Sequence, residues 1–216
     1  MGRYTIIAAR QLANYIKDNT DLLLVNPKDC PYRDHVGALF TDIILQSAVN
    51  YRNVVVPRVN HVLKAYPKAN SVKRFSNVID KDGAEKVLNW KDSVKLNRMF
   101  NLLQFCLDNN LNVSGEIKDY LFFSENQKEF LKIHGIGNKT LDYLRKLLNF
   151  DSIAVDRHIF SFVHNAGIES KDYDYIKTLV EYTADIMDVS RRTIDYSIWL
   201  YMSSNIKDKQ LSIDFQ

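Results

Sequence analysis

The sequence of 216 residues predicts an all-α fold, because almost every apolar pattern in it has the period of a helix. Residues 152–155 form the one convincing extended stretch, which is too short and solitary for a sheet. We therefore expect a bundle of about ten short helices. In chain order the helical segments are 5–17, 36–49, 54–66, 93–107, 115–122, 125–132, 139–148, 157–165, 171–187 and 191–202.

Residues that interrupt helices separate these segments. The breaks fall at Pro27, Pro31, Pro67, Asp82-Gly83, Ser114-Gly115, Gly135 to Gly137, and Gly167. Ser124 followed by Gln127 has the spacing of a capping box and predicts the start of a short helix.

The order of the segments favours two lobes, because the middle helices are contiguous and the terminal ones are separate. We expect residues 34–150 to form a central lobe, with two helices joined by a glycine turn at 124–148. Residues 1–33 and 151–216 would form the second lobe, with a cleft between the lobes.

Composition excludes several classes of protein. No run approaches the roughly 18 apolar residues of a membrane span, and the N-terminus lacks the apolar core of a signal peptide. Cys30 and Cys106 are isolated and the five histidines are dispersed, which argues against disulfides and a zinc site. The net charge of +3 permits an anionic partner without requiring one. We expect an intracellular monomer without membrane contact, located in the cytoplasm or nucleoid, or in a eukaryotic nucleus.

The most informative segment begins with Gly135 and Gly137, which bracket one residue between two helices. Glycine permits positive φ and close approach of the backbone, and the start of the second helix attracts phosphate. A common alternative for such a turn is a simple helix C-cap. The residues expected to grip a DNA backbone are Gly135, Ile136, Gly137, Asn138 and Thr140.

Lys139 and Asp156 flank the second helix of this turn. Lys139 lies in its first turn, where the helix dipole disfavours a cation and so favours the free amine needed for nucleophilic attack. Asp156 follows an extended stretch and precedes a helix, which predicts an N-cap. The alternatives are a surface lysine and a purely structural cap. The spacing of the two residues along the chain favours a shared catalytic role.

At these residues the chain resembles the helix-hairpin-helix DNA glycosylases of the endonuclease III superfamily. Their pattern Leu-x-Gly-x-Gly-x-Lys-Thr is met at residues 133–140, and Ile-x-Val-Asp-x-His-Ile is met at 153–159. His134 stands where the family usually has proline. The resemblance extends from about residue 34 to 202, including residues 45–48 and 195–200.

The resemblance implies that Lys139 is a Schiff-base nucleophile and that Asp156 supports release of the base. It also implies that a K⁺ or Na⁺ ion binds the backbone carbonyls of Leu131, Ile133 and Ile136. Residues 202–216 contain no cysteine, so the iron–sulfur cluster common in the superfamily is not expected and no cofactor is required. The compact 8-oxoguanine glycosylases, which also lack the cluster, are the most similar subgroup in size.

Asp42, Gln46 and Trp199 are candidates for a pocket that receives a flipped base. Asp42 stands inside an apolar helix, as does a base-protonating glutamate in the adenine-mismatch branch, and Gln46 lies one turn further along. A solvent-facing acid and a packed core indole are the alternatives for Asp42 and Trp199.

Two loops are candidates for insertion into DNA. Asn50, Tyr51 and Arg52 could fill the gap left by an extruded nucleotide or form an ordinary loop. The loop 89–93 occupies the region of a second wedge, although its Trp90 is more typical of a core.

These observations predict a bifunctional DNA glycosylase with AP-lyase activity, acting on double-stranded DNA in base excision repair. The alternatives are a monofunctional glycosylase that uses Asp156, and a non-catalytic DNA-binding protein. The excised base stays open among oxidised pyrimidine, 8-oxoguanine, mismatched and hypermodified bases.

Overall fold

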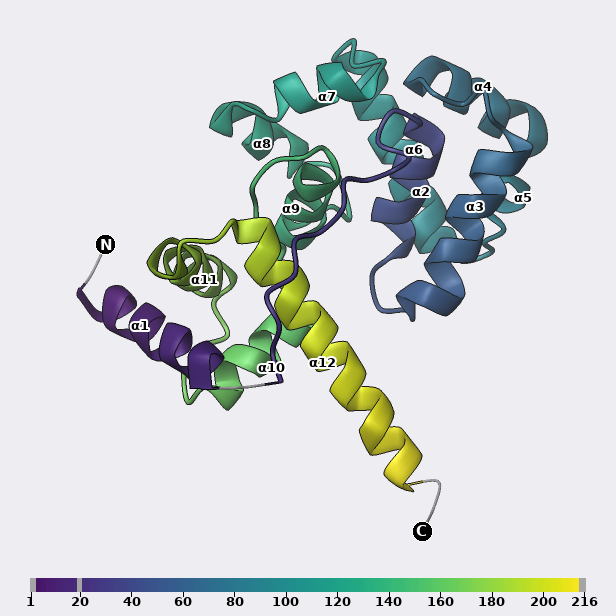
Figure 1. Ribbon diagram of the computed structural model, residues 1–216. Helices are drawn as coiled ribbons and strands as arrows, with labels where there is room; N and C mark the ends of the chain where they lie inside the picture. Colours follow the sequence, from purple (N-terminus) through teal and green to yellow (C-terminus); the bar gives the residue numbers. More distant parts are fainter. Residues whose placement is uncertain (1–2, 19–20, 214–216) are drawn as a thin grey trace. The chain divides into compact units, whose positions relative to one another are not determined.

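The computed structural model describes residues 3–18 and 21–213, and within these ranges the protein is all-helical, as predicted (Figure 1). None of the helices within those ranges is long and apolar enough to cross a membrane. The α-helices are α1 (Arg3–Asp18), α2 (Val36–Leu45), α3 (Val56–Ala65), α4 (Val72–Asp82), α5 (Ala84–Leu88), α6 (Ser93–Asp108), α7 (Ser114–Tyr120), α8 (Ser124–Phe130), α9 (Asn138–Leu147), α10 (Arg157–Asn165), α11 (Tyr173–Met187) and α12 (Arg191–Ile213). A π-helical turn, Tyr51–Val55, precedes α3.

The chain divides into two compact units. The central unit is Asp29–Phe150, and the terminal unit combines Met1–Lys28 with Asp151–Gln216. Residues 29–33 therefore belong to the central unit, whereas the sequence analysis assigned them to the other lobe. The cleft between lobes stays a prediction.

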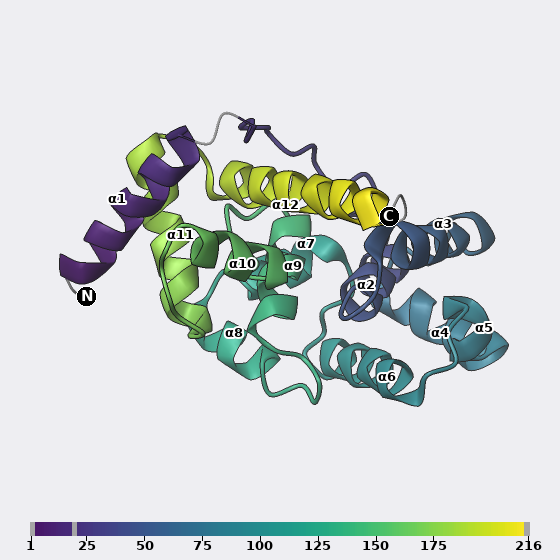
Figure 2. The same ribbon diagram turned by 90° about the horizontal axis from the view of Figure 1, so that it is seen from below.

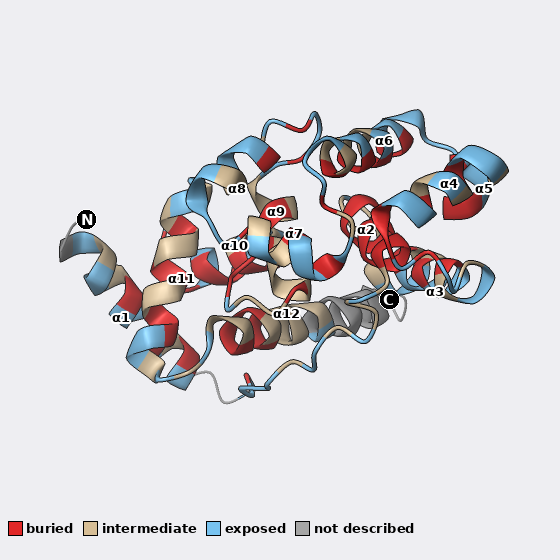
Figure 3. Cartoon of the chain, turned by 90° about the horizontal axis from the view of Figure 1, so that it is seen from above, coloured by how far each residue is buried: buried red, intermediate tan, exposed pale blue. Residues whose placement is uncertain are grey.

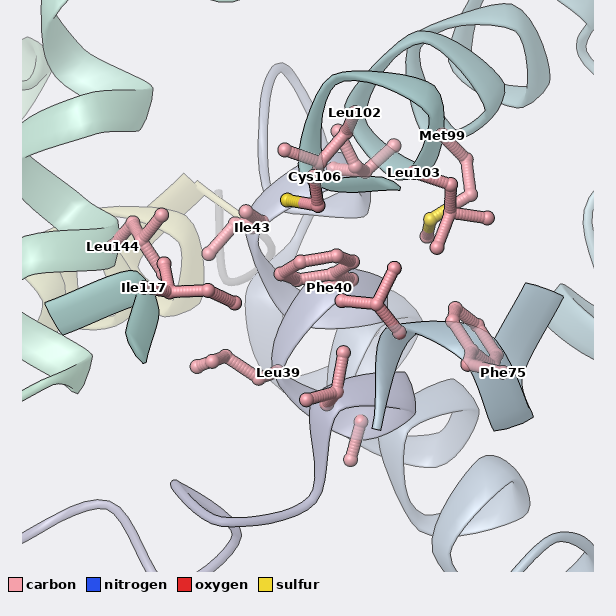
Figure 4. Packing of buried hydrophobic residues seen from close by; sticks show 14 of the residues in the cluster. Leu39, Phe40, Ile43, Phe75, Met99, Leu102, Leu103, Cys106, Ile117 and Leu144 are labelled. Carbon is pink, nitrogen blue, oxygen red and sulfur yellow. The ribbon is translucent and has the colours of Figure 1, made fainter. Parts of the chain in front are cut away.

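Helix α2 is the centre of the central unit, and every one of its residues is buried (Figure 3). It contacts α3, α4, α6 and α9. Phe40 lies among side chains from several of these helices, including Phe75 and Leu102 (Figure 4). Thr41 and Asp42 are the two polar side chains of this buried helix, and the Asp42 carboxylate therefore needs partners inside the protein.

Several predicted boundaries were wrong. Helices α4 and α5 were not predicted, and α2 ends at Leu45 rather than at residue 49. Beyond that end, Ala48 has a left-handed φ of 58°. The predicted capping box is also wrong, because Ser124 is the first residue of α8 and its hydroxyl donates to Glu125.

The terminal unit packs α1 against α11, and α10 and α11 against α12 (Figure 2). Its core includes Phe162, whose ring meets the edges of Tyr15 and Tyr201 at centroid distances of 5.2 and 5.9 Å. This packing holds the start of α10, where Asp156 lies.

Candidate functional site

The turn between α8 and α9 is a hairpin held in place by its own apolar residues. Phe130, Ile133 and Ile136 are buried in the core of the central unit, and the Ile136 amide donates to the Ile133 carbonyl at 3.0 Å. The intervening His134 and Gly135 are exposed, as is Gly137. The hairpin is therefore a fixed backbone loop with an open outer surface.

The two glycines of the hairpin differ in backbone conformation. Gly135 has a φ of +85°, which disfavours any residue with a Cβ. Gly137 has ordinary extended backbone, φ −120° and ψ 178°, so the expectation of positive φ holds only for Gly135. A Cβ built on Gly137 meets no atom within 4 Å. No neighbour within the described ranges requires glycine there.

Helix α9 begins without a side-chain cap, because its N-cap is Gly137. The start of a helix carries partial positive charge, which attracts anions. Lys139 is the second residue of α9 and is half-buried, next to Asn138 and Thr140. The hairpin thus places the uncapped start of a helix beside an amine, and binding of an anion there stays a prediction.

The three carbonyls proposed as cation ligands lie in this hairpin. The Ile133 carbonyl accepts the hydrogen bond from the Ile136 amide, and it keeps a second lone pair for a cation. Leu131 is the C-cap of α8 and has helical backbone angles. The cation stays a prediction.

Asp156 is the N-cap of α10, which confirms its predicted position. One of its carboxylate oxygens accepts from the His158 amide at 2.8 Å and from the Ile159 amide at 3.1 Å. These bonds leave the other oxygen of the half-buried carboxylate outside the cap. The cap fixes the side chain in one orientation.

Asp195, which sequence reasoning did not single out, supports the segment before Asp156. Its buried carboxylate accepts from the Ala154 amide at 2.8 Å, while Ile153 and Val155 are buried on either side. An acid on α12 therefore fixes the backbone that delivers Asp156. A buried acid 41 residues away has no local sequence signal that links it to this segment.

Asp42 is fully buried and accepts hydrogen bonds from three tyrosines. Its Oδ2 accepts from the hydroxyls of Tyr32 at 2.6 Å and Tyr51 at 3.0 Å. The Tyr143 hydroxyl lies 3.2 Å from both carboxylate oxygens. We call these four residues the Asp42 cluster. The alternative of a solvent-facing acid is wrong, because Asp42 joins the segment before α2, the π-helical turn and α9.

Burial raises the pKa of Asp42 to about 6, although the three hydroxyl donors lower it. Burial and the nearby Asp42 charge also raise the pKa of Tyr51 to about 12 and that of Tyr143 well above its ordinary value. The tyrosines therefore stay protonated and act as donors near neutral pH. Cys30 lies near this cluster, and burial raises the pKa of its thiol to about 11.

Gln46 and Lys95 define the end of α2. Gln46 is half-buried, and its amide nitrogen has no hydrogen-bond partner among the described residues. The Lys95 ammonium donates to the carbonyls of Leu45 at 2.8 Å and Ser47 at 2.7 Å, and it lies 4.7 Å from the Trp90 ring centroid. The Trp90 ring, in the loop 89–93, thus packs against the Lys95 ammonium.

The expected wedge residues lie at the start of the π-helical turn. Asn50 caps this turn by accepting from the Asn53 amide, and Arg52 is exposed. Tyr51 turns its hydroxyl inward to Asp42, so any insertion of its ring into DNA requires that hydrogen bond to break. Insertion of Asn50, Tyr51 or Arg52 stays a prediction.

Trp199 belongs to the terminal unit and is half-buried on α12. Its ring stacks on Tyr196 at an interplanar angle of 13° and a centroid distance of 6.1 Å. It is therefore not a fully enclosed core indole. Its role in a base pocket stays a prediction.

Comparisons with known proteins identify the fold. Residues 102–203 match a family described as a domain of unknown function, DUF8548. No curated protein matches the sequence. The solved structure of H. pylori 3-methyladenine DNA glycosylase (MagIII) bound to 1,N6-ethenoadenine is similar, with a TM-score of 0.57 and 19% sequence identity. The similarity covers 93% of this chain and 98% of that one, so the protein has the fold of this DNA glycosylase.

Proposed function

We propose that the protein is a DNA glycosylase that excises a damaged or modified base and cleaves the resulting site as an AP lyase. The observation that carries the proposal is the exposed, uncapped hairpin before α9, in a chain with a glycosylase fold. Such a backbone binds a DNA phosphate without reading sequence. The hairpin would hold the duplex while the target nucleotide is flipped out of the stack.

In the proposed reaction, the deprotonated amine of Lys139 attacks C1′ of the deoxyribose. The glycosidic bond breaks, its electron pair leaves with the base, and the base takes up a proton. The C1′–O4′ bond then breaks as the sugar ring opens, O4′ takes up the remaining proton of the attacking nitrogen, and an imine forms between Lys139 and C1′. Removal of a C2′ proton next expels the 3′ phosphate by β-elimination.

Asp156 would stabilise the positive charge that develops on the sugar as the base departs. The two cap bonds support this role, because they hold the carboxylate in one orientation before substrate arrives. Its free oxygen is the one available to the sugar. Asp195, by holding the Ala154 amide, would act as a positioning residue.

Borohydride trapping tests the lyase step. Lesion-bearing duplexes are incubated with the protein and borohydride, which reduces an imine to a stable covalent adduct. We expect an adduct with the wild type and none with Lys139→Gln. Lys132→Gln is the matched control, because Lys132 belongs to the same hairpin and pairs with Glu129 at 2.7 Å.

The outcome separates the proposal from its two rivals. Base release without strand cleavage that survives Lys139→Gln would indicate a monofunctional glycosylase. Binding of DNA without base release from any lesion would indicate a non-catalytic DNA-binding protein. The lesion panel contains 3-methyladenine, 1,N6-ethenoadenine, 8-oxoguanine, an oxidised pyrimidine and a mismatched base.

Asp156→Asn tests the carboxylate apart from the cap. Asparagine caps helices about as well as aspartate, so the free energy of unfolding should change by only a few tenths of a kcal/mol. We expect base release under single turnover to slow by about a hundredfold or more. Asp172→Asn, at the N-cap of α11, is the matched control and should leave base release unchanged. Equal rates for Asp156→Asn and wild type would reduce Asp156 to a structural cap.

A further inference from the structure

Arg98 on α6 lies against the hairpin turn at Gly135. A Cβ built on Gly135 would lie 2.5 Å from Arg98 Nε and 2.6 Å from its Cγ, so the arginine stem lies directly against the glycine. Arg98 is half-buried and its Nε is inaccessible. The positive φ of Gly135 and the close approach of Arg98 thus occur at the same residue.

The Arg98 guanidinium has no acceptor inside the described part of the protein. Its buried Nε lacks a hydrogen-bond partner, and neither an ion pair nor a hydrogen bond joins its terminal nitrogens to another described residue. A guanidinium offers five donors in a planar fork that matches the oxygens of phosphate. Partly buried donors without an acceptor are costly unless a ligand satisfies them.

The charges around Arg98 are mostly positive. Burial lowers the pKa of the neighbouring Lys95, and Arg98 and Arg58 lower it further, while Asp92 opposes them. Lys95 and Arg58 nevertheless have carbonyl acceptors, which are Leu45 and Ser47 for Lys95, and Val54 and Asn89 for Arg58. Of the three cations Lys95, Arg58 and Arg98, only Arg98 has no acceptor among the described residues. Its guanidinium is therefore left for an external anion.

We propose that Arg98 binds a DNA backbone phosphate at the hairpin, beside the start of α9. This role rests on the proposed DNA-binding function and adds a side-chain contact to the backbone contacts. The anion is a phosphate of the duplex backbone, because the Arg98 guanidinium lies at the turn that the proposed function places on DNA. The contact would be independent of base sequence.

The test measures affinity for an undamaged, fluorescently labelled duplex as salt rises from about 50 to 200 mM. Arg98→Met retains an aliphatic stem over Gly135 and removes the charge. We expect it to weaken binding about tenfold at low salt and to reduce the slope of log affinity against log salt by about one. Arg98→Lys retains the charge and should keep the wild-type slope, with part of the affinity lost because the fork is gone.

Arg74→Gln is the matched control. Arg74 lies on α4, on the other side of α2 from α8 and α9, and its guanidinium donates to Asn70 (Figure 1). Its salt slope should equal that of the wild type. Thermal unfolding of each variant is recorded in parallel.

Two results would overturn the role of Arg98. One is an unchanged salt slope in Arg98→Met. The other is an equal loss of affinity in Arg98→Met and Arg98→Lys with a lowered unfolding midpoint, because packing on Gly135 would then be responsible. If the wild type still releases bases, either result removes only the Arg98 contact. If the wild type neither binds duplex DNA nor releases bases, the proposed function and the Arg98 contact both fall.

Discussion

The Asp42 cluster and the hairpin are both polar features of the central unit, but they differ in whether their hydrogen-bond donors have acceptors inside the protein. In the cluster, three hydroxyls converge on one buried carboxylate, so its donors are satisfied inside the protein. In the hairpin, the start of α9 has no side-chain cap and Arg98 has no described partner. Variants in the cluster should therefore change stability, whereas variants on the hairpin surface should change DNA binding.

Among variants of the Asp42 cluster, Asp42→Asn should cause the largest change in the pH dependence of the unfolding free energy. The pKa of Asp42 is raised from 3.8 to about 6, so the folded state holds a proton that the unfolded state has lost between about pH 4 and pH 6. The free energy of unfolding therefore falls as pH rises through this window, by roughly 3 kcal/mol for a shift of this size. Asp42→Asn should remove that fall.

Denaturant unfolding across this pH range measures the difference between wild type and Asp42→Asn. Asp80→Asn, at an exposed position on α4, is the control for a general charge effect. If the unfolding free energies of wild type and Asp42→Asn changed with pH in parallel, the Asp42 cluster would not control the pH dependence of stability.

Tyr143→Phe should have the next largest effect. It removes one hydroxyl donor from a buried carboxylate, which costs about 1–3 kcal/mol of unfolding free energy near neutral pH. The pKa of Asp42 should rise further, because the Tyr143 hydroxyl lowers it. The pH-dependent fall in stability should then extend to higher pH.

Tyr120→Phe is the matched control for this measurement. Its hydroxyl has no hydrogen-bond partner among the described residues, and its ring packs edge-on against Phe105. Equal losses of stability in Tyr143→Phe and Tyr120→Phe would show that the hydrogen bond to Asp42 contributes nothing.

Gly137→Ala, on the hairpin, should give the smallest change in stability. The backbone there suits alanine and the added Cβ enters open space, so unfolding free energy should stay constant or rise by about 0.4–1 kcal/mol. Duplex affinity should fall, because the methyl group occupies the outer surface where DNA approaches. Gly135→Ala, with its positive φ and the Arg98 contact, should instead destabilise the fold by more than about 1 kcal/mol.

DNA affinity is measured by fluorescence and stability by denaturant unfolding, for both Gly137→Ala and Gly135→Ala. Wild-type DNA affinity in Gly137→Ala would show that the outer surface of the hairpin is not in contact with the duplex.

Features that depend on neighbouring residues could be predicted from the sequence. Helical periodicity gave the all-α class, and the extended stretch before Asp156 predicted its N-cap correctly. Helix α4 was missed although Val72, Phe75 and Ile79 have helical spacing and Ser71 caps the start.

Features that depend on distant residues could not be predicted. Asp42 meets Tyr143 from 101 residues away, and the end of α2 is held by Lys95 from 50 residues away. The partners of Asp42 decide whether it is a surface acid or a buried one, and no local pattern contains them. For the same reason, the contact between Arg98 and Gly135 was visible only in the folded chain.

Cys30 gives the molecule an internal reporter of movement beside Asp42. Since burial raises the pKa of its thiol to about 11 and that of Cys106 to about 12, almost no thiolate exists at neutral pH while the fold is closed. Thiol reagents react with the thiolate, so both cysteines should resist labelling and oxidation in the native protein. Because Cys30 is two residues from Tyr32, its rate of alkylation would follow the release of that segment without any engineered probe.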